Sequence, residues 1–418
     1  MGSFGMISRR VVETNMPVMV QIQELIRGVK DVVSLAQGIV YWQPPKEALD
    51  KIKELVSDPI ISRYGADEGI PELRQALIHK MRRENQLERS SVMVTAGANQ
   101  AFVNLVLALC DAGDSVVMFA PYYFNAYMSF QMTGVTNIIV GPGDPASLHP
   151  DADWLENVLS EINPAPKVVT VVNPGNPSGT YIPLPLLKRM SDLCEKAGCW
   201  LIVDNTYEII TQVFHVRWVE ALLCGRRSRS KHLLLLQSIW NDGMASGLCK
   251  SVHFSSSIGF DSWPLQIAYP SNVTELEAQL LKIQDNIPIC ASLVSQHLAL
   301  YSLEMGADWV KDRVKELAKN REIVKAALSA LGEGAVKGGE GAIYLWAKLP
   351  EKCEDDGNVV RWLAVKHGVV VIPGSASGCA GYIRISFGGL PENECLAAAV
   401  RLKRGVEELV AQGICDTS

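Results

Sequence analysis

The chain has 418 residues, of which 48% are hydrophobic and 20% charged, and its formal net charge at pH 7 is −6. This length allows a large core and predicts two domains, and the absence of a basic stripe argues against nucleic acid or a membrane surface as a partner. No apolar run reaches transmembrane length, and the N-terminus lacks the apolar stretch of a secretory signal, so we expect a cytoplasmic protein. The 10 cysteines show no CxxC spacing, which favours reduced thiols, and no metal site is expected.

Helical and strand patterns alternate from about residue 72 onward, which predicts an α/β fold with a mostly parallel central sheet covered by helices on both faces. The first of these helices begins at Pro71, a residue suited to a first helical turn. Apolar runs predict strands at 92–94, 115–119, 137–140, 168–172 and 199–203, with a helix at 184–197. One long helix is expected near 274–304 and another at 307–332. Strand patterns within 336–347 and 368–388 then indicate a smaller α+β domain.

Polar motifs follow two of the predicted strands. Residues 173–180 read Asn-Pro-Gly-Asn-Pro-Ser-Gly-Thr directly after one strand, and Asp204 and Tyr207 follow the next. Because ligands of α/β sheets bind at the carboxyl ends of the strands, we expect these side chains to form a site. A lone Asp after a strand is more often a helix cap, but the two motifs together are far more specific.

Together these motifs resemble those of the class I/II aminotransferases, enzymes of fold type I that use pyridoxal 5'-phosphate (PLP) as cofactor. The resemblance implies that Asp204 pairs with the protonated pyridine nitrogen of PLP, which keeps the ring an electron sink. It also implies that Asn176 and Tyr207 reach the phenolic oxygen of the cofactor. Asp204 and Tyr207 are therefore the expected catalytic residues.

Two further segments match positions at which the family binds its cofactor. Gly97, Ala98 and Asn99 follow a strand and open a helix, where backbone N–H groups bind phosphate well, and the resemblance places them at the cofactor phosphate. Tyr123 lies two residues after Pro121, and the resemblance implies that its ring stacks on the pyridine. Packing in the core is the competing role for such an aromatic residue, and it is about as common.

The resemblance also covers the subunit contact and the substrate. Tyr64 matches a residue that reaches the phosphate of the neighbouring subunit, which implies a homodimer. Gly38 matches the loop near the substrate carboxylate, to which Asn176 also contributes. Arg384 stands mid-strand between apolar neighbours and needs a partner, which is either the α-carboxylate of the substrate or a structural salt bridge.

The lysine that holds PLP as a Schiff base is missing from its expected place. It should follow Asp204 by a few tens of residues, near Gln237, but no amine stands in that window. Lys231 comes too early and lies in a basic tract, and Lys250 comes later without the expected Ser and Gly neighbours. Both are interpreted as ordinary lysines.

Shifting the reading frame restores the missing segment. When codons for residues 237–249 are read from the second base of the Gln237 codon, they permit Lys-Ala-Tyr-Gly followed by Gly-Trp-Arg, with the lysine in register. Cys249-Lys250-Ser251 permits a splice donor, and Leu265-Gln266 permits an acceptor-like end. We therefore hypothesise that residues 209–266 are a frame-shifted exon plus a retained intron, from a misassigned exon boundary or a real splice variant. A natural insertion that moved the lysine is the alternative.

Residues 38–42 and 284–288 resemble the plant aromatic aminotransferases most closely. That subgroup transfers amino groups between aromatic amino acids or methionine and 2-oxo acids such as indole-3-pyruvate, which links it to auxin metabolism. The expected domains are 1–40, an N-terminal arm and part of the small domain; 41–288, the PLP-binding large domain, anomalous over 209–266; and 289–418, the small C-terminal domain. The chain as written is expected to be inactive or nearly so. A non-catalytic homologue and a PLP-dependent lyase or decarboxylase of the same fold are the alternatives.

Overall fold

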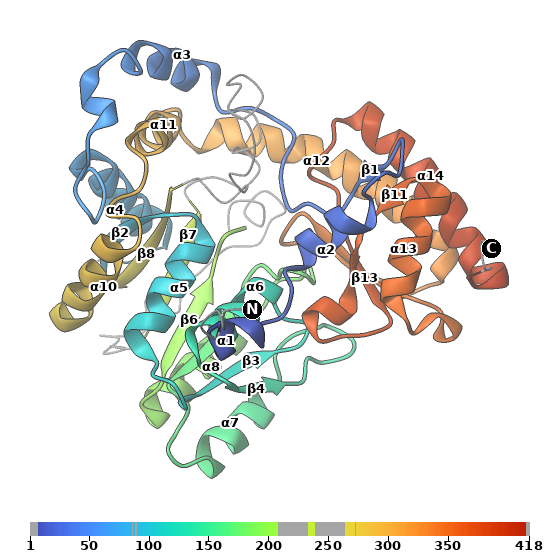
Figure 1. Cartoon of the computed structure of the whole chain (residues 1–418), viewed down its shortest axis with the longest axis horizontal. Coiled ribbons are helices and arrows are strands. Elements are labelled where there is room, and N and C mark those ends of the chain that lie inside the picture. The colour runs from blue at the N-terminus through green and yellow to red at the C-terminus, as the bar shows by residue number, and fades with distance from the viewer. Residues whose placement is uncertain are drawn as a thin grey trace, which may run out of the picture.

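The computed structural model describes residues 7–85, 87, 90–207, 233–238, 264–271 and 273–414. In this part of the chain a seven-stranded sheet has the order β2-β8-β7-β6-β5-β3-β4 (Figure 1). Its strands are β2 (Ser90–Ala96), β3 (Ser115–Phe119), β4 (Asn137–Gly141), β5 (Val168–Val172), β6 (Trp200–Asp204), β7 (Leu233–Ser238) and β8 (Pro264–Pro270). β8 runs antiparallel to both of its neighbours, and the other pairings are parallel. The predicted α/β fold with a mostly parallel sheet is confirmed.

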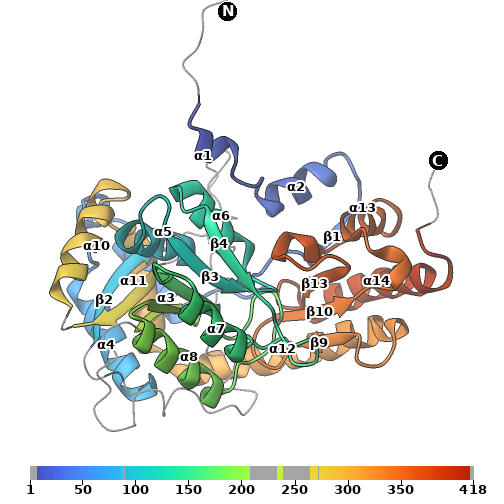
Figure 2. The same cartoon turned by 90° about the horizontal axis from the view of Figure 1, so that it is seen from below.

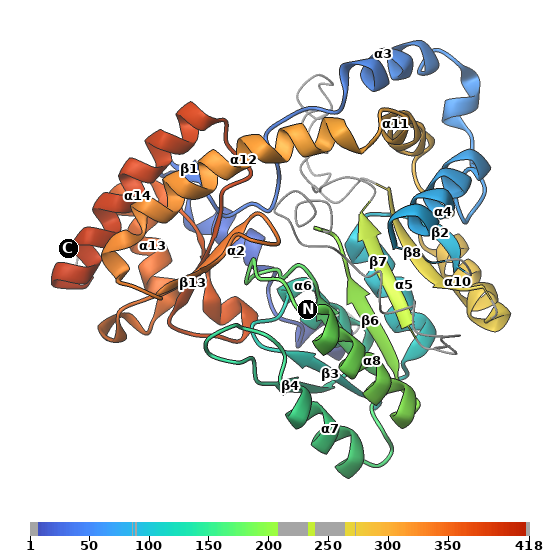
Figure 3. The ribbon, with the colours of Figure 1, turned by 180° about the vertical axis from the view of Figure 1, so that it is seen from behind.

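Both faces of this sheet are buried because alternate strand residues enter two different cores. Val116 and Ile202 pack with one group of helices, which comprises α5 (Ala98–Leu109), α6 (Phe124–Thr133) and α10 (Thr274–Asn286). Val117 and Val203 belong to the core on the other face, which includes residues of α4 (Pro71–Asn85), α7 (Ala152–Glu161) and α8 (Leu184–Ala197). Figures 1 and 3 show these two helical layers from opposite sides. A strand buried on both faces reads as a continuous apolar run, and that is how the sequence revealed it.

The small domain is built around a four-stranded antiparallel sheet with the order β12-β13-β10-β9 (Figure 2). Its strands are β9 (Val336–Gly338), β10 (Tyr344–Lys348), β12 (Ile372–Pro373) and β13 (Tyr382–Ser386). The helices α12 (Ala307–Ala327), α13 (Asp356–His367) and α14 (Glu392–Gln412) pack around it, with short 3₁₀ turns η3 (Ser329–Leu331), η4 (Glu351–Cys353) and η5 (Gly374–Ser377). The predicted domain boundaries remain predictions.

The N-terminal part of the chain contacts a helix beside the large sheet and a strand of the small domain. α1 (Arg9–Val12) contacts α6, and β1 (Val33–Ser34) pairs in parallel with β11 (Val369–Val370) of the small domain. α2 (Val18–Leu25) lies between these two points (Figure 2). α3 (Lys46–Leu55) and the turn η1 (Pro59–Ser62) then lead to α4 on the large domain.

The single long helix expected near 274–304 is wrong, because two helices occupy this region. α10 ends at Asn286 and α11 (Leu293–Glu304) begins after a break. Pro288 has no N–H group to continue the helical hydrogen bonds, and Ile289 has a φ of 66°, in the left-handed region. The expected helix at 307–332 also ends early, with α12 at Ala327 followed by the turn η3.

The anomalous window at 209–266 contributes strand β7. Leu233–Leu236 pair in parallel with Leu201–Asp204 of β6, so the leucine run occupies the sheet position expected for the family's lysine-bearing strand. The remainder of that window, including Lys231 and Lys250, lies outside the described residues except for Pro264–Gln266 in β8. Among the helices that the structure describes, none has the length and apolar character needed to cross a membrane.

Candidate active site

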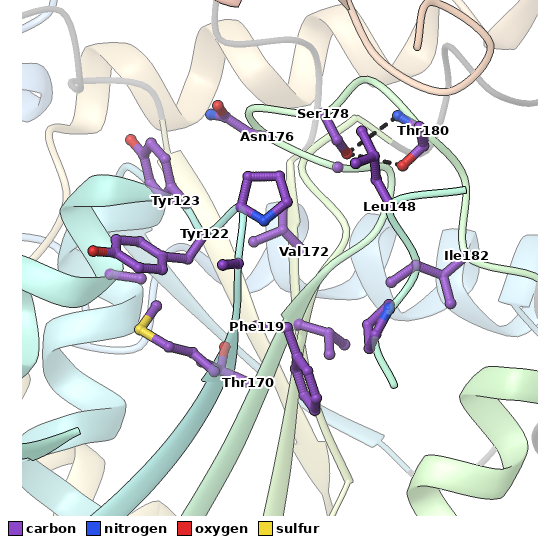
Figure 4. Close-up of a pocket in the computed structure, with 17 residues that line it drawn as sticks. Phe119, Tyr122, Tyr123, Leu148, Thr170, Val172, Asn176, Ser178, Thr180 and Ile182 are labelled. Carbon is purple, nitrogen blue, oxygen red and sulfur yellow. Dashed lines mark hydrogen bonds between the residues drawn. The ribbon is translucent and has the colours of Figure 1, made fainter. Parts of the chain in front are cut away.

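The carboxyl ends of β5 and β6 place the two polar motifs side by side. Val172 and Asp204 are register partners, and the Asn173 N–H donates a 2.8 Å hydrogen bond to the Asp204 carbonyl. The turn after β5 then carries Asn176 into a cavity that Tyr122 and Tyr123 also line (Figure 4). The edge of the sheet predicted from the sequence is therefore the edge at which these side chains meet.

Asp204 is a buried carboxylate without a cation beside it in the described part of the chain. Its Oδ1 accepts hydrogen bonds from the Thr206 backbone N–H at 3.0 Å and from the Thr206 hydroxyl at 2.6 Å. Burial raises the pKa of Asp204 above its usual value, and the two Thr206 bonds offset this only in part. A cationic partner would stabilise the ionised form of this buried carboxylate, and a protonated pyridine nitrogen is such a cation.

The start of α5 offers a place for a phosphate group. Gly97, with a φ of 90°, is the N-cap residue of the helix and makes no side-chain cap hydrogen bond. The Tyr123 hydroxyl donates a 3.3 Å hydrogen bond to Asn99 Oδ1 and accepts one of 2.9 Å from Asn125 Nδ2. The predicted phosphate loop and the predicted stacking residue thus adjoin each other at the N-terminus of a helix, where backbone N–H groups suit an anion.

Arg384 is 2% exposed and lies in β13 of the small sheet. Its Nη1 donates a 2.8 Å hydrogen bond to Asn176 Oδ1, and its Nη2 donates one of 2.6 Å to the Ala36 carbonyl. Its buried Nε has no hydrogen-bond partner among the described residues. The structural salt bridge that the sequence left open is not found in the described part of the chain, where no carboxylate pairs with Arg384. The guanidinium therefore retains capacity for an external carboxylate.

Gly38 lies against a pair of tyrosine hydroxyls. The buried side chains of Tyr207 and Tyr344 share a hydrogen bond between their hydroxyl groups, and their rings meet edge to face at 5.3 Å. A Cβ added to Gly38 would lie 2.0 Å from Tyr344 Oη and 3.3 Å from Tyr207 Oη. Glycine is therefore required at position 38 because the two tyrosine hydroxyls lie so close to it, and not because of its backbone angles.

Tyr344 is the contact residue that the sequence did not reveal. It stands in the apolar run Ile343-Tyr344-Leu345-Trp346, where an aromatic residue reads as part of the core. Tyr344 is 1% exposed, and its ring centroid lies 4.5 Å from the Arg384 guanidinium carbon. No motif distinguishes it from its neighbours, so only the fold identifies it.

Tyr64 does not join this cluster within the chain. Its side chain is 78% exposed, and it follows the turn η1. The neighbouring Gly65 N–H donates a 3.3 Å hydrogen bond to Cys290 Sγ at the break between α10 and α11. An exposed Tyr64 is compatible with a reach into a second subunit, and this remains a prediction.

The residue expected to be a lysine is Gln237, which β7 places opposite Gln266 of β8. No lysine is among the residues that line the cavity of Figure 4. Lys231 and Lys250, which are the lysines between Asp204 and Ile267 in the sequence, lie outside the described residues. The residues described at this edge of the sheet therefore fit the charged and polar groups of PLP, and the residues that line the cavity include no amine for a Schiff base. Nor do the described residues contain a cluster of His, Cys, Asp or Glu that could hold a metal ion.

Comparison with known proteins identifies the family of the chain. Residues 30–402 match the family described as aminotransferase class I and II. The chain belongs to this family. Its members use PLP to move an amino group between amino acids and 2-oxo acids, and the predicted cofactor and reaction type are confirmed at that level.

Similar proteins align with most of the chain. The aromatic aminotransferase ISS1 of Arabidopsis thaliana is 59% identical over 423 residues, which span 100% of both proteins. The aspartate aminotransferase of Pyrococcus abyssi is 26% identical over 372 residues, with 87% of this chain and 89% of that protein covered. Among solved structures, aspartate aminotransferase from Thermus thermophilus with maleate has a TM-score of 0.80 at 23% identity and covers 96% of this chain and 100% of its own. The predicted fold type I is confirmed.

Proposed function

We propose that this sequence builds the substrate site of an aminotransferase for aromatic amino acids, with 2-oxo acids such as indole-3-pyruvate as amino acceptors. The observation that carries the proposal is the buried Arg384, which Asn176 holds and which no carboxylate neutralises in the described part of the chain. The relative named aromatic aminotransferase, at 59% identity over the full length, supports the aromatic class of substrate. A role in auxin metabolism and a cytoplasmic location belong to the same proposal.

The described residues would hold PLP through three kinds of contact. Asp204 would pair with the pyridine nitrogen and keep its proton in place, because the buried carboxylate lacks another cation there. The N–H groups at Gly97–Asn99 would bind the phosphate, and the Tyr123 ring would cover the pyridine. When bound, the cofactor supplies an electron sink for the charge that develops at the substrate α-carbon.

The substrate would be oriented by residues of both sheets. Arg384 would bind the α-carboxylate, and Asn176 and Tyr207 would direct hydrogen bonds to the phenolic oxygen of the cofactor. Gly38 would leave room for the approach of the carboxylate. These assignments use the same side chains that the sequence motifs predict, with Tyr344 added between them.

The chain has no lysine at the position near Gln237 where the family forms its Schiff base with PLP. A frame-shifted exon with a retained intron over 209–266 accounts for Gln237 at the Schiff-base position and for the lysine that the shifted frame restores. On this hypothesis the 418-residue chain retains binding groups without the covalent catalyst. A homodimer in which Tyr64 reaches the partner subunit's phosphate site completes the proposal, and the exposure of Tyr64 supports it.

The experiment compares two proteins, namely the 418-residue chain and a variant in which the frame-shifted window is replaced by the shifted-frame peptide that ends before Ile267. Each is incubated with PLP, passed through gel filtration, and assayed with phenylalanine or tryptophan plus a 2-oxo acid. We expect retained cofactor absorbance and formation of a new amino acid in the replaced variant. Released ammonia or CO₂ would indicate the lyase or decarboxylase alternative, and a replaced variant with no turnover and no bound PLP would indicate a non-catalytic homologue.

A further inference from the structure

Tyr344 lies between the arginine of the small sheet and the tyrosine that follows β6 of the large sheet. In the antiparallel pairing of β10 with β13, Tyr344 is opposite Ser386 and Trp346 is opposite Arg384. Residues two apart on a strand share a face, so Tyr344 and Arg384 are diagonal neighbours on one face of the sheet. The guanidinium carbon accordingly lies 4.5 Å from the centre of the Tyr344 ring.

The other end of Tyr344 is its hydroxyl, which forms a hydrogen bond with the Tyr207 hydroxyl. Either oxygen can act as the donor in this bond, and the rings stand at 80° to each other. The backbone at Gly38 closes one side of the pair and leaves no space for a side chain there. One residue thus contacts both the carboxylate-binding cation and the phenol expected at the cofactor.

The direction of the shared hydrogen bond decides what Tyr207 can do. If Tyr344 donates, the proton of Tyr207 points to an acceptor other than Tyr344; if Tyr207 donates, its proton lies in the shared bond. A guanidinium above the Tyr344 ring draws electron density from it, which favours Tyr344 as the donor. A carboxylate bound to Arg384 neutralises that cation and weakens the preference.

We propose that Tyr344 is a positioning residue that couples carboxylate occupancy at Arg384 to the hydrogen bonding of Tyr207. This inference rests on the proposed function, because it takes Arg384 as the carboxylate site. It adds a physical route by which binding of the substrate carboxylate in the small domain changes the donor presented by the large domain. By linkage, a change at Tyr207 must in turn alter the affinity for a carboxylate.

The test uses the full 418-residue chain without cofactor, and 3-phenylpropanoate as a carboxylate probe that lacks the amino group. Calorimetric titration gives the probe affinity of the unchanged chain, Tyr344→Phe, Tyr207→Phe and the double variant. Each Tyr→Phe change keeps the ring and removes the hydroxyl, and thermal unfolding checks that each variant is folded. Tyr301→Phe, in α11 beside Lys51, is the matched control.

We expect Tyr207→Phe to change the probe affinity about twofold or more when Tyr344 is present, and clearly less when Tyr344→Phe is already made. If Tyr344 had only a structural role, the effects of the two single substitutions on probe affinity would add in the double variant. Additive effects, or no effect of Tyr207→Phe, would overturn the coupling. If Tyr344→Phe fails to fold, the single Tyr207→Phe measurement still decides, because a missing effect contradicts the proposal and a twofold change supports it.

Failure of the proposed function gives a different pattern. If the probe binds Arg384→Lys as well as the unchanged chain, Arg384 is not the carboxylate site, and both proposals fall. If the coupling is present but PLP does not bind in a separate titration, the cofactor assignment fails and the coupling stands.

Discussion

Arg384 donates a 2.8 Å hydrogen bond to Asn176, so a strand of the small sheet is fixed against the turn that follows β5 of the large sheet. Both residues are buried, and because Asn176 is uncharged their contact is not an ion pair. A carboxylate added to this contact would bind a charged donor that is already oriented by a neutral acceptor. On the proposed function, the substrate site would be shared between the small sheet and the large sheet.

The 418-residue chain should transaminate at a small fraction of the rate of the restored-frame variant. Loss of a covalent catalyst typically costs several orders of magnitude in rate, and Gln237 cannot form an imine. The measurement is the formation of indole-3-pyruvate or phenylpyruvate from the amino acid and a 2-oxo acid by each purified protein. Turnover by the unchanged chain at rates typical of enzymes would contradict the frame-shift hypothesis and make Lys250 the candidate amine.

Asp204→Asn should stabilise the cofactor-free chain at alkaline pH while it impairs catalysis in the restored-frame variant. Burial raises the pKa of Asp204 in the folded state, so the folded chain holds a proton that the unfolded chain has released. The free energy of unfolding consequently falls as pH rises from the unfolded pKa through the folded pKa, and Asn removes this loss while it still accepts the Thr206 hydrogen bonds.

Thermal unfolding of the two proteins at several pH values measures this effect. The unfolding temperature of Asp204→Asn should exceed that of the unchanged chain at about pH 8, and the difference should shrink toward about pH 3, below the unfolded pKa, where Asp is mostly protonated in both states. A variant that is less stable at about pH 8 would indicate a cation beside Asp204, contributed by residues outside the described ranges.

Gly38→Ala should weaken binding of carboxylates and of PLP, with little loss of fold. The added Cβ would lie 2.0 Å from Tyr344 Oη, so Tyr344 must move away from residue 38, and Tyr207, which is hydrogen-bonded to it, must shift too. Displacements of this size at a binding site commonly cost about tenfold or more in affinity. Gly357→Ala is the matched control, because an added Cβ there would come no nearer than 3.4 Å to another atom. Equal affinities in the two variants would contradict the assignment of Gly38.

Arg384→Lys should reduce the affinity for 3-phenylpropanoate by about tenfold or more. Lysine lacks the planar guanidinium group that can bind a carboxylate and donate to Asn176 at the same time. Arg189→Lys serves as the control, since Arg189 pairs with Asp153 and Glu156 on the surface. Titration calorimetry of both variants gives the comparison. An unchanged affinity in Arg384→Lys would place the carboxylate elsewhere.

Local patterns in the sequence predicted five strands of the large sheet and the edge of the sheet at which Asn176 and Asp204 lie. The β5 and β6 strands read as apolar runs because both faces are buried, and Asn176 and Asp204 follow them within a few residues. The break between α10 and α11 was missed because the helical pattern continues on both sides of Pro288. Tyr344 was missed because its role depends on strand pairing across the small sheet, which no short motif encodes.

The pairing of β1 with β11 also bears on how the protein is made. Val33 and Ser34 emerge from the ribosome early, whereas their partners Val369 and Val370 are synthesised near the end. Contacts between such distant segments form late, because a long loop must close first. The large domain can thus fold during synthesis, while the first segment waits for the C-terminal strand. A truncation that removes either β1 or β11 should therefore leave the other strand unpaired and prone to aggregate.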